Sequence, residues 1–260
     1  MNDCKAQKDT RHIIEALSRF KERTGYTPSG IKAALIDMDG TLYDSMPWHA
    51  RAWHRMITEL GIEATVDEFF SYEGMTGKAT VNLLFERAFG RTASDEEVTE
   101  LYARKSLYFQ QNNHAEVMPG AQSMVSTYRS RGITPILVTG SGQATLMARL
   151  TEDFFGEFPA ERRITSRDVQ HGKPSPEPYL KGLELAGVQP WEAVVVENAP
   201  LGVRSGVAAG IFTFAVKTGP VPMSSLIDAG ADLCFDSMKE FANELPSILD
   251  NINSFNPCLL

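Results

Sequence analysis

Short, uninterrupted apolar runs recur along this chain, and stretches with helical periodicity separate them. The apolar runs cover residues 33–37, 135–139, 193–197, 211–216 and 231–235. Helical patterns lie at 120–131, 142–153, 176–187 and 200–209. Short strands that are apolar throughout are typical of a sheet covered on both faces. Their alternation with helices predicts an α/β fold, namely a doubly wound (Rossmann-like) parallel sheet.

Residues 47–117 interrupt this alternation. They carry helical patterns at 48–60, 67–70, 79–89 and 95–111 but no strand pattern. The segment follows the first strand, and α/β sheets bind ligands beyond the carboxyl ends of their strands. We therefore predict an inserted, all-helical cap domain at 47–117, placed as a lid over a catalytic core formed by 31–46 and 118–260.

A further amphipathic helix is predicted at residues 10–25, ahead of the first strand. Its apolar face consists of Ile13, Ile14, Leu17 and Phe20. We assign residues 1–30 to an N-terminal helical extension that packs on the outside of the core. The pattern alone indicates no function for it.

The charge, the apolar runs and the cysteine spacing argue against several classes of function. The 260-residue chain has a formal net charge of −8 and no long basic run, which argues against nucleic acid or an anionic membrane as a partner. No apolar run is long enough to span a bilayer, and the polar start lacks the apolar stretch of a signal peptide. The wide spacing of Cys4, Cys234 and Cys258 suits neither a zinc site nor a disulfide framework. We expect a cytoplasmic protein, either a monomer or a homodimer.

Two carboxylates follow the first apolar run. Asp37 and Asp39 are two residues apart at the end of the predicted strand, so their side chains point the same way, and Gly40 then allows a sharp turn. One carboxylate in such a pair can attack a substrate while the other handles a proton or helps to hold a metal. Taken by itself, the segment is equally consistent with a strand that ends in an acidic turn.

A hydroxyl and a glycine-rich turn end the second apolar run, in the order Thr139-Gly140-Ser141-Gly142. Backbone N–H groups at the start of the helix that follows suit an anion, although an ordinary strand-to-helix turn looks the same. This is not a Walker A loop, because the required glycine spacing is absent.

Two further segments fall at the same predicted edge of the sheet. Lys173 lies just before a proline-rich helix start, where prolines restrict the backbone and help to hold the ammonium group in place. Glu197 and Asn198 end the third apolar run and offer oxygen ligands to a hard cation such as magnesium. An exposed loop lysine and an acidic helix cap are the alternatives.

These four segments, in this order and each at a strand end, resemble the motifs of the haloacid dehalogenase superfamily of phosphohydrolases over residues 31–240. The helical insertion after the first motif resembles the β-phosphoglucomutase-like branch. Within that branch, the sequence Glu73-Gly-Met-Thr-Gly77 in the cap and Glu197-Asn198-Ala-Pro in the fourth motif look most like inorganic-pyrophosphatase-type members.

The resemblance implies that Asp37 is the nucleophile and forms an aspartyl-phosphate, while Asp39 protonates the leaving group and then activates water. Lys173 would offset negative charge. Mg2+ would be held by the Asp37 carboxylate, the Asp39 backbone carbonyl, Glu197 and Asn198. Asn198 departs from the pattern, because this motif more often carries Glu-Asp; we expect weaker magnesium binding rather than loss of activity.

The resemblance also implies that Thr139 and the backbone N–H groups of Gly140 and Ser141 hold the oxygens of the transferring phosphoryl group. The substrate would be a small phosphorylated molecule or inorganic pyrophosphate. These roles agree with general chemistry, because an anionic nucleophile that approaches an anionic phosphate needs its charge cancelled and its geometry fixed.

The cap residues bear on specificity. By resemblance, His49 on the helix that enters the cap faces the active site; packing or a hinge is the alternative. Mutase relatives tend to carry an arginine where this chain has Gly77, beside Lys78. Glu73 would repel a bulky anion there or order a water molecule, and Lys105 is the candidate contact for a distal phosphate. A solvated helix lysine is the alternative for Lys105.

Inorganic pyrophosphatase is therefore the predicted activity. The alternatives are a β-phosphoglucomutase, which the missing loop arginine disfavours, and a sugar-phosphate phosphatase, which differs only in the selectivity of the cap. A non-catalytic phosphate-binding protein on the same fold is disfavoured because Asp37, Asp39 and Lys173 are all present.

Overall fold

The computed structural model describes residues 2–112, 114–142 and 144–255, and side chains from residue 10 onward. Its centre is a sheet of parallel strands in the order β3-β2-β1-β4-β5-β6. The strands are β1 (Ala33–Ile36), β2 (Thr134–Val138), β3 (Arg163–Ile164), β4 (Ala193–Glu197), β5 (Phe212–Val216) and β6 (Leu233–Phe235). The predicted doubly wound α/β fold is confirmed.

Helices cover both faces of the sheet, which explains why its strands are apolar throughout. On β1, Ala34 and Ile36 join a cluster on one face, and Ala33 and Leu35 join a cluster on the other. The first cluster includes side chains of α1 (Asn2–Thr24), α5 (Ala121–Ser130), α6 (Ala144–Asp153) and α10 (Met238–Ser254). Helix α7 (Glu177–Ala186) packs on the opposite face. Helices α8 (Pro200–Ala208) and α9 (Met223–Asp228) pack together beside β5.

The sequence patterns do not predict strand β3, helices α9 and α10, or the 3-10 helices η2 (Ala160–Arg162) and η3 (Pro190–Glu192). Strand β3 has only two residues and lies at the edge of the sheet, so it leaves almost no apolar pattern. Helices α9 and α10 follow the last strands; α10 is clearly amphipathic and buries its apolar face in the main core. Helix α1 begins at Asn2, earlier than the predicted residue 10.

The N-terminal helix is firmly packed on the core. Phe20 contacts Phe212 of β5, with ring centroids 5.3 Å apart. Arg23 donates to both carboxylate oxygens of Asp232, at 2.8 and 2.9 Å. Tyr26, just after the helix, donates to the carbonyl of Gly210 at 2.6 Å. The predicted apolar face of α1 therefore extends one face of the core.

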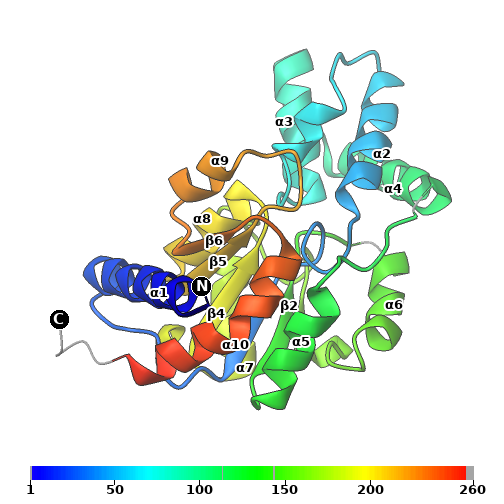
Figure 1. Cartoon of the computed structure of the whole chain (residues 1–260). Coiled ribbons are helices and arrows are strands. Elements are labelled where there is room, and N and C mark those ends of the chain that lie inside the picture. Colours follow the sequence, from blue (N-terminus) through cyan, green and yellow to red (C-terminus); the bar gives the residue numbers. More distant parts are fainter. Residues whose placement is uncertain (1, 113, 143, 256–260) are drawn as a thin grey trace.

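All the regular secondary structure in the described residues of the insertion is helical. It consists of α2 (Met46–Thr58), the 3-10 helix η1 (Asp67–Phe70), α3 (Gly77–Phe89) and α4 (Asp95–Asn112). These helices share a separate apolar cluster and rise above the carboxyl ends of the strands (Figure 1). We propose the same division into extension, core and cap that the sequence predicts.

The two connections between insertion and core run side by side. The N–H of Asp44 donates to the carbonyl of Glu116, and the N–H of Met118 donates to the carbonyl of Leu42, both at 2.9 Å. Paired linkers of this kind allow a cap to move as a unit.

In the part of the chain that the structure describes, no helix is long and apolar enough to cross a membrane. Cys234 is a free thiol. Cys4 and Cys258 lie outside the residues whose side chains are described.

Candidate active site

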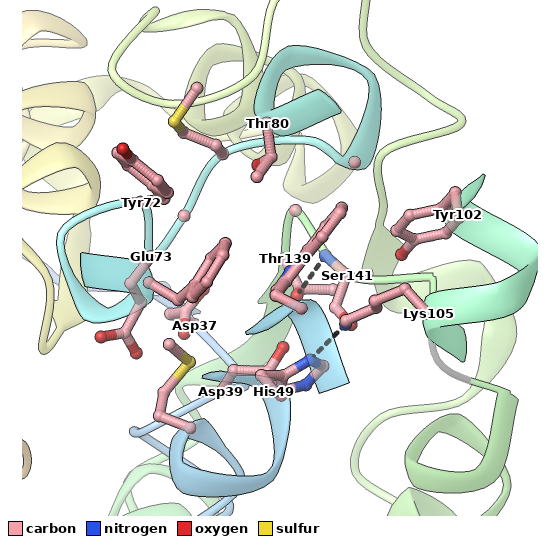
Figure 2. A pocket seen from close by; sticks show the side chains of 17 residues that line it. Asp37, Asp39, His49, Tyr72, Glu73, Thr80, Tyr102, Lys105, Thr139 and Ser141 are labelled. Atoms are coloured by element: carbon pink, nitrogen blue, oxygen red, sulfur yellow. Dashed lines mark hydrogen bonds and ion pairs between the residues drawn. The ribbon is translucent and has the colours of Figure 1, made fainter. Parts of the chain in front are cut away.

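A cavity lies between the carboxyl ends of the strands and the cap (Figure 2). Eight of the residues singled out in the sequence line it: Asp37, Asp39, His49, Glu73, Lys105, Thr139, Gly140 and Ser141. Lys173, Glu197 and Asn198 do not line the cavity. Lys173 contacts Asp37 and Asn198 contacts Glu73, both of which line it, and Glu197 contacts Lys173. The fold thus brings all the predicted site residues to one place.

Asp37 and Lys173 form a buried ion pair. The N–H of Asp37 donates to the carbonyl of Val196, so the main chain continues the β1–β4 ladder and delivers the carboxylate to the sheet edge. The ammonium of Lys173 lies 2.5 Å from Asp37 Oδ1 and also donates to the carbonyl of Val138 at 3.1 Å. Burial alone would lower the pKa of Lys173, but Asp37 and Glu197 raise it above its usual range, so the lysine is a permanent cation.

Glu197 holds this lysine from the other side. Its Oε1 accepts from Lys173 at 2.5 Å and from the Tyr179 hydroxyl at 2.7 Å. Its Oε2 accepts from the backbone N–H groups of Asn198 and Ala199, at 3.0 and 3.3 Å. Both oxygens are therefore engaged within the protein, and the role of Glu197 as a magnesium ligand stays a prediction. These contacts support a role in positioning Lys173.

Tyr179 was not predicted as a site residue. It lies on α7 and is fully buried, and its ring lies beneath the Lys173 ammonium, 5.2 Å away. A tyrosine on an amphipathic helix normally indicates core packing, so the sequence carried no signal for its contact with Glu197.

Asp39, His49 and Lys105 form a hydrogen-bonded chain from the core into the cap. His49 Nε2 lies 2.9 Å from Asp39 Oδ1, and Lys105 Nζ lies 2.6 Å from His49 Nδ1. Ser45, at the start of α2, also donates to Asp39 Oδ1 at 2.6 Å. His49 stacks on the ring of Phe109, with centroids 4.1 Å apart. The predicted position of His49 in the site agrees with this geometry.

The surroundings shift the pKa values of all three ionisable groups. Burial would raise the pKa of Asp39, but His49 and Ser45 hold it at about 2. Burial and the neighbouring Lys105 lower the pKa of His49. Burial lowers the pKa of Lys105 to about 7, although Asp39 opposes this shift. Lys105 is only 2% exposed, so the alternative of a solvated helix lysine is excluded.

The turn after β2 presents hydroxyl groups to the cavity. The N–H of Ser141 donates to Thr139 Oγ1 at 3.0 Å. This N–H therefore has a partner within the turn, whereas the sequence predicts that it holds a phosphoryl oxygen. The Ser141 hydroxyl is buried and has no hydrogen-bond partner among the described residues. A Cβ atom on Gly140 would lie 2.8 Å from the carbonyl of Gly74, so only glycine fits where this turn meets the cap. A buried hydroxyl without a partner in the wall of a cavity suits a polar ligand.

Glu73 reaches from the cap to the core. Asn198 Nδ2 donates to Glu73 Oε1 at 2.7 Å, and the Thr41 hydroxyl donates to Asn198 Oδ1 at 3.2 Å. A Cβ atom on Gly40 would lie 2.0 Å from Asn198 Nδ2, and Gly40 has a positive φ of 79°, so the turn after Asp39 requires glycine for two reasons. Burial raises the pKa of Glu73 well above its usual range, and the nearby carboxylates add to this effect.

The donor chemistry fits a hard divalent cation. Among the described residues, no three His, Cys, Asp or Glu side chains surround one point in the way a ready-made metal centre requires. The Asp37 carboxylate, the Asp39 backbone carbonyl and the Asn198 amide nevertheless supply only oxygen atoms, which are the ligands that Mg2+ prefers. Carboxylates also outnumber ammonium groups here, so a cation would relieve their mutual repulsion.

The family model described as haloacid dehalogenase-like hydrolase matches residues 31–210. The chain belongs to this family. It is 34% identical to hexitol phosphatase A of Escherichia coli K12 over 188 residues, which cover 72% of this chain and 83% of the relative. It is 29% identical to a Clostridium perfringens protein provisionally named pyrophosphatase PpaX, over 87% of this chain and 99% of the relative.

Solved structures agree with this assignment. A protein from Bacteroides vulgatus, provisionally named a beta-phosphoglucomutase, superposes with a TM-score of 0.89 at 42% identity, covering 94% of this chain and 99% of that one. The predicted family and its β-phosphoglucomutase-like branch are confirmed. This haloacid dehalogenase-like protein is a phosphatase-type enzyme.

Proposed function

We propose that this enzyme is a magnesium-dependent hydrolase of a small phosphate, with inorganic diphosphate (pyrophosphate) as its substrate. The observation that carries the proposal is the cavity, which has Asp37 on one side and the ammonium of Lys105 with the unpartnered Ser141 hydroxyl on another. Two anionic groups in tandem match these two sites.

In the proposed mechanism, Asp37 attacks the first phosphoryl group and forms an aspartyl-phosphate as the bond to the leaving phosphate breaks. Lys173 stabilises the charge on the nucleophile and on the phosphoryl oxygens. Asp39 is ionised at neutral pH and is placed to take a proton from the water that hydrolyses the intermediate, while the leaving phosphate departs as an anion. Thr139 faces the transferring phosphoryl group from β2.

In this proposal, residues of the cap bind the distal phosphoryl group. Lys105 supplies a positive charge, and its link through His49 to Asp39 connects the binding of the distal group with the acid–base residue. Mg2+, held by Asp37, the Asp39 carbonyl and Asn198, would cancel negative charge during transfer.

A sugar-phosphate phosphatase is the second candidate, favoured by the similarity to hexitol phosphatase A. It uses the same core residues and differs in the cap. A mutase is less well supported, because Gly77 offers no side chain to grip a second phosphate on a sugar.

Phosphate release from a panel of compounds tests the proposal. Diphosphate, hexose phosphates, hexitol phosphates, triose phosphates and nucleotides are compared with and without Mg2+, with the Asp37→Asn protein as the control for contaminating phosphatases. A high kcat/KM for diphosphate alone supports the proposal. Comparable rates on several organic phosphates contradict it in favour of the second candidate, and conversion of β-glucose 1-phosphate to glucose 6-phosphate identifies a mutase.

Asn198→Asp is expected to tighten magnesium binding by about tenfold or more, because a carboxylate replaces a neutral amide in the donor set. Without Mg2+ the same change should destabilise the fold by about 1–3 kcal/mol, since the new carboxylate faces Glu73 where an amide now donates to it. Thermal unfolding against Mg2+ concentration measures both effects. The change Asn253→Asp, at an exposed asparagine, is the control. Unchanged or weaker magnesium affinity would remove Asn198 from the metal site.

The pH dependence of kcat/KM should report Lys105. Its pKa of about 7 means that the free enzyme loses this positive charge as the pH rises through 7, so kcat/KM for diphosphate should fall on the alkaline side. An arginine in the Lys105→Arg variant stays charged over the whole pH range, so kcat/KM should not fall on the alkaline side. The titration of the substrate itself is common to both enzymes. Lys78→Arg, on the exposed surface of the cap, is the control; identical profiles for Lys105→Arg and wild type would contradict the assignment.

A further inference from the structure

The start of α3 and the middle of α4 fit together without space for a side chain between them. A Cβ atom on Gly77, the first residue of α3, would lie 2.2 Å from Cδ2 and 2.4 Å from Cε2 of Tyr102. Real Cβ atoms do not approach ring carbons so closely, so any side chain at position 77 requires Tyr102 to move. Only a residue without a Cβ atom fits beneath this ring.

Tyr102 is also held at its far end. The backbone N–H of Gly142, in the turn after β2, donates to the Tyr102 hydroxyl at 3.1 Å. The ring lies 6.1 Å from that of Trp53, and the Lys105 ammonium lies 5.8 Å from its centroid. The ring is therefore fixed between the cap helices and the core turn, and it is not the free end of a flexible side chain.

This fixed ring forms part of the cavity wall. Figure 2 shows Tyr102 and Lys105 extending from α4 on one side of the cavity, with Glu73 on the opposite side. Ser141 and Gly77 also line the cavity. Tyr102 thus stands beside the two groups, Lys105 and Ser141, to which the distal phosphoryl group was assigned above.

We propose that Tyr102 sets the size limit of the leaving group. Its ring, fixed against Gly77 and tied to Gly142, fills the space beyond the distal phosphoryl site that a polyol or sugar would need. This proposal rests on the proposed function, because it explains how the cavity selects diphosphate. Gly77 and Tyr102 act as a pair, since the small residue makes room for the large one.

The first test compares kcat/KM for diphosphate with kcat/KM for a hexitol phosphate. In Tyr102→Ala, the preference for diphosphate should fall by about tenfold or more, chiefly because turnover of the hexitol phosphate rises. Tyr102→Phe keeps the ring and should retain most of the preference. Tyr108→Ala, a tyrosine on the same helix that bonds to Glu59 and does not line the cavity, is the matched control. A preference that is unchanged in Tyr102→Ala, or lost equally in Tyr102→Phe, would overturn the proposal.

A second test measures the coupling of the pair. Gly77→Ala should lower kcat/KM for diphosphate by about tenfold in the wild-type background but by less than about threefold in Tyr102→Ala, where the ring is gone. Equal effects in both backgrounds would overturn the proposed pairing. Circular dichroism checks that each variant is folded.

The proposed function and the proposed role of Tyr102 can be rejected independently of each other. A wild-type enzyme without activity on diphosphate rejects the proposed function. In that case, a rise in hexitol phosphate turnover in Tyr102→Ala would still support Tyr102 as the size limit, and no rise would reject it too.

Discussion

Asp37→Asn is expected to lower kcat by about 10⁴-fold or more on the substrate found in the panel above. Losses of this size follow the removal of a nucleophile from a cooperating group of residues. An amide has the same shape but cannot form the aspartyl-phosphate. Phosphate release under saturating substrate and Mg2+ measures the loss. Single-turnover experiments with labelled substrate and acid quenching should show no label attached to the variant protein.

The fold should survive this change. Lys173 keeps its contacts with Glu197 and with the carbonyl of Val138, so the buried ammonium is not stranded. Asp44→Asn, an exposed aspartate in the linker to the cap, is the matched control and should retain near wild-type activity. Asp39→Asn should also abolish turnover. An Asp37→Asn protein that keeps more than about a tenth of the wild-type rate would contradict the assigned nucleophile.

Lys173→Met is expected to cost about 3–5 kcal/mol of folding free energy as well as nearly all activity. The ammonium lies 2.5 Å from both Asp37 and Glu197, and its removal leaves two buried carboxylates facing each other without a cation. At about 2–4 °C per kcal/mol, the midpoint of thermal unfolding should fall by about 10 °C. Lys181→Met, farther along on α7, is the control and should be close to neutral.

The loss of stability should depend on pH in a defined direction. Burial and the neighbouring carboxylates already raise the pKa of Asp37 in the folded protein, and removal of Lys173 takes away the cation that opposes this shift. Folded protein then binds more protons than unfolded protein, so stability falls as the pH rises above the unfolded pKa of about 4. The deficit relative to wild type should therefore be larger at pH 8 than at pH 5. A deficit that grows on acidification would contradict the buried ion pair.

A second substitution separates stability from chemistry. Glu197→Gln in the Lys173→Met background removes one stranded charge and should recover part of the lost stability, because the remaining amide still accepts from Tyr179. It should recover no activity, since the cation beside Asp37 is still missing. Recovery of turnover in the double variant would show that Lys173 acts only on folding.

Much of the core could be predicted from the sequence because its patterns are local. The runs at 33–37 and 193–197 match β1 and β4 closely, and strands covered on both faces leave a continuous apolar signal. The helices of residues 47–117 were recognised by their periodicity. Strand β3 could not be predicted, because two residues at a sheet edge carry no periodicity. Its pairing with β2 exists only in the folded sheet.

The site likewise has residues that the sequence predicts and contacts that it does not. Asp37, Asp39 and Lys173 stand out in the sequence because charged groups at the ends of buried strands and before a proline-rich turn are unusual there. Their partners could not be predicted. Glu197 is predicted as a metal ligand from its place at a strand end, whereas its contacts with Lys173 and Tyr179 depend on how α7 packs on the sheet.

Local composition thus specifies the strands, the inserted helices and the chemistry at the strand ends, since each depends on residues that are neighbours along the chain. The tertiary structure alone decides which charges pair and how large the cavity is. Lys173 meets Asp37 across 136 positions of sequence, Asn198 meets Glu73 across 125, and Tyr102 meets the Gly142 backbone across 40. Contacts of that separation arise only when the sheet assembles and the cap packs on it, so no local pattern encodes the environment that sets the pKa of Lys105 or the space left at Gly77.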